Sequence, residues 1–145
     1  RKKYPGLRPA AFQIPWALDD GFGTLLPTMQ SDITLTQGST VLIIDAKYYS
    51  QISKIYFDAS NYRSNNLYQI FTYVKNKDSE LDGRQHKVSG MLLYAQTDGY
   101  IPTDSIYQMS GNQISVKTLD LNCEFSEIVA QLNAIIEDHF EIVGV

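Results

Sequence analysis

Four aliphatic residues run without a polar break into an acid, a small residue and a base near the start of the chain, as Val41-Leu42-Ile43-Ile44-Asp45-Ala46-Lys47. Side chains of a β-strand alternate between its two faces, so a run that is apolar on both faces predicts a central strand covered on both sides. We expect this strand to span residues 40–49. By the same alternation, Asp45 and Lys47 leave the strand on one face and Ala46 on the other.

Other apolar or alternating stretches predict the rest of a sheet. We expect further strands at residues 11–14, 29–35, 88–97, 105–109 and 113–119. The stretch at 29–35 alternates as a half-exposed strand does and is joined to the central strand by a short connection of the hairpin type. The stretch at 88–97 is strongly apolar and predicts a second buried strand.

Two segments carry apolar residues at helical spacing. Residues 50–66 are polar and predict a loop whose last residues, Ser64, Asn65 and Asn66, offer N-caps for a helix that continues through Lys77. A second helix is expected at residues 125–140. Its apolar stripe is wide, which is typical of a helix face buried in the core; the stripe consists of Phe125, Ile128, Val129, Leu132, Ile135, Ile136 and Phe140.

The order of these elements is βββαβββα. A helix between two buried strands predicts a crossover connection, with the two strands parallel and the helix on one face of the sheet. The expected fold class is therefore α/β, a mixed β-sheet core with α-helices packed on it.

Composition sets the general class. A chain of 145 residues with 43% hydrophobic and 19% charged residues is long enough for one domain with a proper core. Nothing resembles a signal peptide or a membrane-spanning run, so the sequence predicts a soluble, cytoplasmic protein without membrane contact. The single cysteine, Cys123, predicts a packing residue. The chain begins with Arg1 and a basic stretch ended by Pro5, so we expect a piece of a longer chain.

Charge is unevenly distributed along the chain. Residues 1–97 hold 11 Lys and Arg against 8 Asp and Glu, a net charge of +3, whereas residues 98–145 hold 1 against 8, a net charge of −7. The net charge of −4 argues against a protein that wraps nucleic acid mainly by charge. The first part of the chain is nevertheless able to meet phosphates.

The candidate chemistry lies in Asp32, Asp45 and Lys47, three charges on consecutive expected strands. Two carboxylates brought together repel each other, and such a cluster usually holds a cation. Magnesium fits one or two carboxylates together with waters and substrate phosphates. A lysine beside it is a charged donor toward a phosphate oxygen or the attacking water, which predicts phosphodiester hydrolysis.

Two interpretations of this cluster are open on the residues alone. Asp-x-Lys is a weak pattern that occurs by chance in many chains, and an acid and a base on one strand face also form surface ion pairs of little energetic worth. Catalysis is favoured because the pair ends a strand too apolar for the surface and because a second Asp precedes it. Gln69 and Tyr73, one turn apart on the first helix, either line the site or pack on the sheet.

Together these stretches resemble a known family. Asp32, the strand ending in Asp45-Ala46-Lys47 and a helix carrying Gln69-x-x-x-Tyr73 resemble the PD-(D/E)xK nuclease superfamily in its Gln-x-x-x-Tyr variant. The sequences at residues 26–35, 43–49, 64–74 and 88–94 are similar to those of McrC, the nuclease subunit family of the McrBC systems that cut modified DNA.

The resemblance implies a restriction-endonuclease-like fold and a single nuclease domain over residues 1–145, the C-terminal part of a longer chain. It implies that Asp32, Asp45 and the carbonyl of Ala46 bind the catalytic Mg²⁺, for which Mn²⁺ is a possible substitute. Lys47 would orient or activate the water and steady the phosphate. Gln69 and Tyr73 would line the site and touch the DNA backbone or support the lysine.

The same resemblance implies partners. The substrate would be double-stranded DNA. A McrB-like AAA+ GTPase would recognise the modification, of the 5-methylcytosine type, and power translocation.

The chain departs from the family pattern in two places. Ser31 stands in place of the proline of the superfamily name, and the acidic helix usual before the first strand is not seen. Two alternatives remain: a non-catalytic docking or regulatory module of the same complex, or a nuclease acting on RNA or branched DNA.

Overall fold

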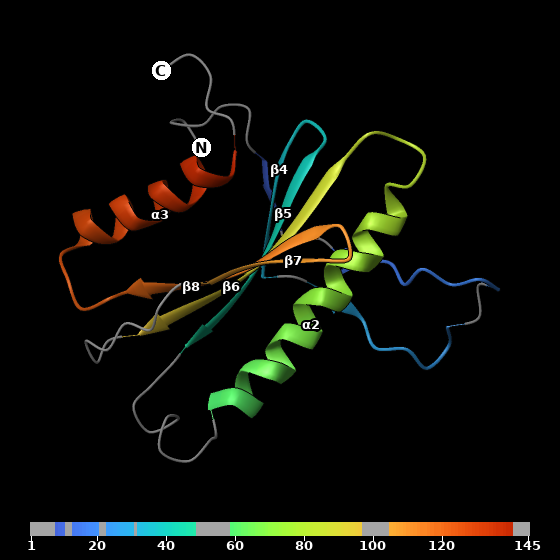
Figure 1. Cartoon of the computed structure of the whole chain (residues 1–145), viewed down its shortest axis with the longest axis horizontal. Coiled ribbons are helices and arrows are strands. Elements are labelled where there is room, and N and C mark those ends of the chain that lie inside the picture. The colour runs from blue at the N-terminus through green and yellow to red at the C-terminus, as the bar shows by residue number, and fades with distance from the viewer. Residues whose placement is uncertain are drawn as a thin grey trace.

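The computed structural model describes residues 8–10, 13–20, 23–30, 32–48, 59–96 and 105–140. Its elements are β1 (Arg8–Ala10), β2 (Gln13–Ile14), β3 (Met29–Gln30), β4 (Ile33–Gln37), β5 (Thr40–Tyr48), α2 (Ala59–Glu80), β6 (Lys87–Gln96), β7 (Ser105–Met109), β8 (Asn112–Asp120) and α3 (Phe125–His139). Six strands form one sheet in the order β1-β4-β5-β6-β8-β7. The helix α2 lies on one face of this sheet and α3 on the other (Figure 1). The predicted α/β class, a restriction-endonuclease-like mixed sheet flanked by helices, is confirmed.

The strand β5 lies at the centre of the sheet, antiparallel to β4 and parallel to β6. Val41 and Ile43 point into the core under α2, and Leu42 and Ile44 into the core under α3. Each of these four side chains is at most 5% exposed. The prediction of a central strand covered on both faces is confirmed over residues 40–48, and Tyr49 lies outside the described residues.

The parallel pairing of β5 with β6 requires the chain to cross over one face of the sheet between them, and α2 makes this crossing. Ile70 and Val74 of α2 are fully buried against the sheet. They meet β6 at Gly90, where an added Cβ would lie 2.7 Å from Val74 Cγ2 and 2.8 Å from Ile70 Cγ1. The predicted βαβ unit is confirmed, and the glycine lets the helix approach the strand closely.

The prediction of one strand over residues 29–35 is wrong. Met29 and Gln30 form β3, which pairs with β2 in a separate two-stranded sheet, and β4 begins only at Ile33. The faces of β4 alternate as predicted, with Thr34 beside Ile43 on the α2 face and Ile33 beside Ile44 on the other face. The exposure differs from the prediction: Thr34 is 2% exposed, whereas Ile33 is 41% exposed. The polar threonine is thus buried as deeply as Leu35 beside it.

The helix α2 begins earlier than predicted. It includes residues 59–66, which the sequence analysis assigned to a loop and to N-caps. Asn66 is a buried residue inside the helix, and its side-chain nitrogen donates to Tyr94 Oη of β6 at 2.9 Å. The N-cap interpretation is therefore wrong for Asn66, because a tertiary hydrogen bond satisfies the side chain that capping would otherwise use.

The C-terminal half follows the prediction more closely. The strands β7 and β8 form an antiparallel hairpin, and α3 ends at His139, one residue before the predicted end. The interpretation of the α3 stripe as core is wrong for part of it: Phe125 is 79% exposed, Leu132 38% and Val129 36%. The other apolar residues of the helix pack against the core on this face of the sheet: Ile128, Ile135 and Ile136.

Three further predictions concern Cys123, the N-terminal segments and membrane-spanning helices. Cys123 is partly buried and its Sγ donates to the carbonyl oxygen of Asp120 at 3.3 Å, as expected of a packing residue. The expected basic helix end at residues 1–5 lies outside the described residues, as do Ala11 and Phe12 of the expected edge strand. In the described part of the chain, no helix combines the length and apolar character needed to cross a membrane.

A substitution at Gly90 tests the close approach of α2. Gly90→Ala should lower the free energy of unfolding by about 1–3 kcal/mol, because the new methyl group overlaps two buried side chains. The measurement is urea denaturation. The double variant Gly90→Ala with Val74→Ala should lose less than the sum of the two single losses, since Val74→Ala makes room for the methyl group.

Ser89→Ala is the matched control for this experiment. Ser89 precedes Gly90 on β6, is fully buried, and its hydroxyl has no hydrogen-bond partner among the described residues. Removal of an unsatisfied hydroxyl should be neutral or slightly stabilising. A Gly90→Ala protein as stable as the wild type would contradict the tight contact.

The end of α2 is held by a histidine. His86 Nδ1 lies 2.6 Å from the carbonyl oxygen of Arg84 and Nε2 lies 2.6 Å from Asp78 Oδ1. Because both ring nitrogens face acceptors, both are satisfied only in the imidazolium form. The carbonyl of Arg84 and then the carboxylate of Asp78 raise the pKa of His86 above its usual value of 6.5.

This arrangement predicts a pH dependence. With a folded pKa above the unfolded value of 6.5, the stabilisation from His86 is complete below pH 6.5 and is lost as the pH rises through the folded pKa. NMR titration of the imidazole should give a raised pKa in the wild type and a lower one in Asp78→Asn. An unchanged pKa in that variant would contradict the ion pair.

Candidate active site

The site begins where the ladder between β4 and β5 stops. The last pair in register is Ile33 with Ile44, so Asp32 and Asp45 follow it at the same end of the two strands. Beyond this pair the amide of Ala46 donates to Asp32 Oδ2 at 2.9 Å. The Asp32 carboxylate is thereby fixed beside the end of β5.

Asp45 and Lys47 leave β5 on the face that α2 covers. They continue the alternation of Val41 and Ile43, which face the same core. Lys47 Nζ lies 3.0 Å from Asp45 Oδ2. Asp45 is 4% exposed, whereas the residue between them, Ala46, is exposed on the opposite face. The predicted placement of the acid and the base on one face is confirmed.

The helix α2 supplies a second wall. Lys47 Nζ donates to Gln69 Oε1 at 3.3 Å, and Gln69 Nε2 donates to Tyr73 Oη at 3.0 Å. Gln69 thus accepts from the lysine with its oxygen and donates to the tyrosine with its nitrogen. Gln69 therefore contacts the charged cluster directly, whereas Tyr73, which is 9% exposed, packs in the core under α2 and reaches the cluster only through Gln69.

A buried pair that the sequence analysis missed supports this wall. The hydrogen bond between Asn66 and Tyr94 joins α2 to β6, and Tyr94 is the residue of β6 in register with Lys47. Asn66, Gln69 and Tyr73 stand at spacings of three and four along the helix, so they share one face. This strip of polar residues beside the apolar positions Ile70 and Val74 was the sequence signal for a polar helix face at the site.

The electrostatics of the cluster are dominated by burial. Burial raises the pKa of Asp45 above its usual value of 3.8, the ammonium group of Lys47 opposes this rise, and the charge of Asp32 adds to it. Asp45 Oδ2 is buried, and the ammonium group of Lys47 lies 3.0 Å from it. Burial of a carboxylate is costly unless it is paired, and this ion pair offsets part of that cost.

The structure therefore gathers every residue that the sequence analysis placed in the site: Asp32, Asp45, Ala46, Lys47, Gln69 and Tyr73. The buried carboxylate of Asp45 and the carboxylate of Asp32 offer oxygen ligands of the kind that a hard cation takes. No group of three or more His, Cys, Asp or Glu side chains with the spacing of a metal site occurs in the described ranges.

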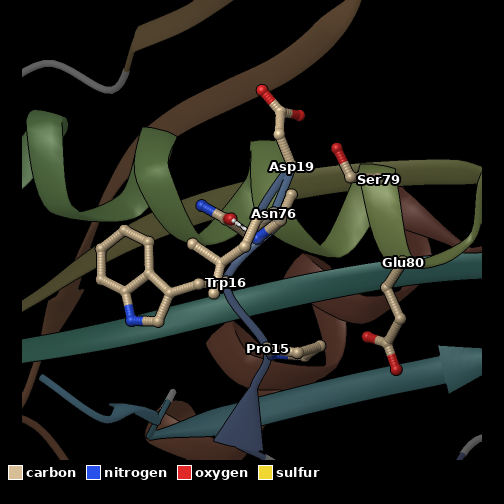
Figure 2. Close-up of a pocket in the computed structure, with 8 residues that line it drawn as sticks. Pro15, Trp16, Asp19, Asn76, Ser79 and Glu80 are labelled. Atoms are coloured by element: carbon tan, nitrogen blue, oxygen red, sulfur yellow. Dashed lines mark hydrogen bonds between the residues drawn. The ribbon is translucent and has the colours of Figure 1, made fainter. Parts of the chain in front are cut away.

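Two hollows adjoin α2. One, of about 360 Å³, lies between residues 15–19 and the last turns of the helix, and the amide of Ala17 donates to Asn76 Oδ1 there at 2.7 Å. Figure 2 shows Asp19, Ser79 and Glu80 around it, with the indole of Trp16 directed away from Glu80. This hollow includes none of the charged residues of the predicted site.

The other hollow is a groove that shares Gln69 and Tyr73 with the site. Trp16 stands at the boundary of the two hollows and lines both. It is partly buried, packs against the core under α2 and donates from Nε1 to the carbonyl oxygen of Pro27 at 2.7 Å. The groove could not be predicted from the sequence, because residues far apart along the chain form it.

Comparison with known proteins gives one relative. The chain is similar to the type IV methyl-directed restriction enzyme EcoKMcrBC of Escherichia coli (strain K12), with 29% identity over 125 residues, which is 86% of this chain. The chain spans about a third of the length of that enzyme, 34%. No model of a known protein family matches the chain.

The buried carboxyl group of Asp45 predicts a gain of stability on its neutralisation. Because its folded pKa lies above the unfolded value of 3.8, its favourable contribution is complete below pH 3.8 and is lost as the pH rises through the folded pKa. Asp45→Asn should therefore be more stable than the wild type at neutral pH, by about 1 kcal/mol, and the gain should shrink in acid.

Urea denaturation at a series of pH values, with a metal chelator present, measures this difference. Asp82→Asn is the matched control, since Asp82 is exposed in the turn after α2 and its loss removes the same charge. A lower stability of Asp45→Asn at neutral pH would show that the ion pair with Lys47 outweighs the cost of burial.

Proposed function

We propose that this chain is a magnesium-dependent DNA endonuclease domain that hydrolyses phosphodiester bonds within a modification-dependent restriction complex. The observation that carries the proposal is the convergence of Asp32, Asp45 and Lys47 at the end of a strand buried on both faces. The similarity to a methyl-directed restriction enzyme supports it independently. Because the chain spans about a third of that enzyme, the activity, substrate and partners of the whole enzyme are proposals for this chain.

The two carboxylates and the carbonyl of Ala46 are the residues that would hold the ion. Asp45 would offer a buried carboxylate, which also faces the ammonium group of Lys47, and Asp32 would offer its carboxylate from the neighbouring strand. When bound, magnesium supplies a positive charge that favours ionisation of water and offsets the charge of the phosphate. Manganese, which also accepts oxygen ligands, should replace it.

Lys47 acts beside these carboxylates. Its ammonium group lies between Asp45 and Gln69, so two contacts from different elements fix its position. From there it would donate to a phosphate oxygen or orient the attacking water. Gln69 holds the lysine and is itself held by Tyr73, which makes both helix residues positioning residues unless the DNA backbone reaches them.

The site requires rigid geometry, because small displacements of reacting groups are costly in a hydrolysis of this kind. The strand β5 supplies this rigidity through its ladders with β4 and β6. Charge also favours approach of DNA from the α2 side. The helix α3, on the opposite face, carries the acids Glu127, Glu137 and Asp138 and neither Lys nor Arg.

The proposed partners are double-stranded DNA and a McrB-like AAA+ GTPase that reads the modified base and drives the complex along DNA. The chain described here would supply the cutting centre alone. Its rival function is a docking or regulatory module of the same complex that keeps the nuclease fold without metal chemistry.

Neutralisation of Asp45 tests the nuclease. Asp45→Asn should lower the rate of DNA cleavage by the complex reconstituted with its GTPase partner by at least about 100-fold, because a ligand of the ion is lost. The assay is conversion of modified plasmid DNA. Asp82→Asn, the same change at an exposed turn, should cut at the wild-type rate, and equal cutting by Asp45→Asn would overturn the assignment.

Metal binding separates the nuclease from its rival. Isothermal titration calorimetry of the chain with Mn²⁺ or Mg²⁺ should give heat from a site that Asp32→Ala removes. Binding of the ion should also raise the melting temperature of the wild type and leave that of Asp32→Ala unchanged. Absence of heat in the wild type would favour the docking module.

A further inference from the structure

The groove that adjoins the charged cluster is lined by uncharged residues. It has a volume of about 450 Å³ and lies between α2 and the segments that carry Trp16 and residues 27–29. Of the described residues that line it, none is charged. Among the aromatic side chains that line it, Tyr68 is the most exposed, at 70%.

The groove is continuous with the proposed active site. Gln69 and Tyr73 line the groove, and Gln69 also accepts a hydrogen bond from Lys47 in the charged cluster. Tyr68 and Thr72 extend the same surface of α2 away from the lysine. A DNA strand whose phosphate lies at Asp32 and Asp45 would therefore place an adjoining nucleotide at the groove.

The chemistry of the walls decides which part of a nucleotide fits. Phosphate is recognised by Lys, Arg or clustered amides, and neither basic residue is among the described residues of the groove. A nucleobase has an apolar face that stacks on aromatic side chains whatever its sequence. Trp16 and Tyr68 supply aromatic surface, and the Thr72 hydroxyl, which donates to the carbonyl oxygen of Tyr68, keeps its capacity to accept a hydrogen bond.

We infer that this groove binds a nucleobase of the DNA strand that adjoins the scissile phosphate, with Tyr68 as its principal contact. The inference rests on the proposed function, since it assumes that DNA occupies the charged cluster. Bases inside a duplex are paired and stacked, so a base enters the groove only when it is unpaired or turned out of the helix. The domain therefore binds an unpaired strand better than an intact duplex.

Tryptophan fluorescence gives a direct readout, because Trp16 is the single tryptophan of the chain and lines the groove. The chain is titrated with a single-stranded deoxyoligonucleotide, a duplex of the same sequence, and an abasic strand of the same length. A metal chelator prevents cleavage, and excitation is set where tyrosine does not absorb. The single strand should change the emission and bind at least about fivefold more tightly than the abasic strand and the duplex.

Substitutions then locate the contact. Tyr68→Ala should weaken binding of the single strand at least about fivefold, and Tyr68→Phe, which keeps the ring, should restore it. Tyr107→Ala is the matched control, because Tyr107 is 38% exposed on β7 at the far edge of the sheet and lies outside the groove. Equal binding of the abasic strand, or equal binding by Tyr68→Ala and Tyr107→Ala, would overturn the inference.

The result can be separated from failure of the proposed function. The fluorescence response of the chain in the chelator reports on the groove, and cleavage by the reconstituted complex with Asp45→Asn reports on the proposed active site. If cleavage depends on Asp45 but Tyr68→Ala changes no binding, the nuclease stands and the groove is not a base site. If the response depends on Tyr68 but cleavage survives Asp45→Asn, the groove binds bases and the catalytic assignment fails.

Discussion

The parallel ladder between β5 and β6 is the constraint on which the rest of the structure depends. Parallel neighbours cannot be joined by a tight turn, so the chain must cross one face of the sheet, and α2 makes that crossing. The glycine at position 90 brings the helix close enough for Ile70 and Val74 to touch the strand. Once these contacts exist, the helix residues one turn apart at positions 69 and 73 have to lie over the end of β5.

That geometry explains why the charged cluster survives in a place where burial opposes it. Asp45 follows directly after four aliphatic residues, so the strand carries its carboxyl group under the helix, and burial raises its pKa. A structure selected for stability alone would replace such an acid by a neutral residue. Lys47 instead pairs with this acid, and Gln69 of the helix holds the lysine in place.

Much of this could be predicted from local patterns, and the failures have physical causes. Three features could be predicted: the strand at 40–48, the crossover and the C-terminal hairpin. In each, the spacing of the apolar residues and the position of the turn residues agree with the way the elements pack. The start of α2 was not, because the partner that satisfies Asn66 is Tyr94, 28 positions away. The exposed residues of α3 were misjudged because apolar spacing gives the face of a helix but not how far the sheet extends beneath it. Gln69 and Tyr73 were singled out by the resemblance to a known family, whereas the hydrogen-bond chain that joins them to Lys47 required the fold.

The polar residues of α2 face two different surroundings. Toward the sheet, Gln69 holds the lysine of a charged cluster suited to phosphate and metal; toward solvent, the same residue borders a groove without charge among its described walls. A nucleotide has the same division, with a charged backbone joined to an aromatic base. A single strand could therefore satisfy both surfaces at once, whereas a duplex presents its phosphates but keeps its bases inside. If the cutting centre is supplied with DNA by a moving partner, local opening of the duplex at this helix would couple delivery of the strand to its alignment with Asp32 and Asp45.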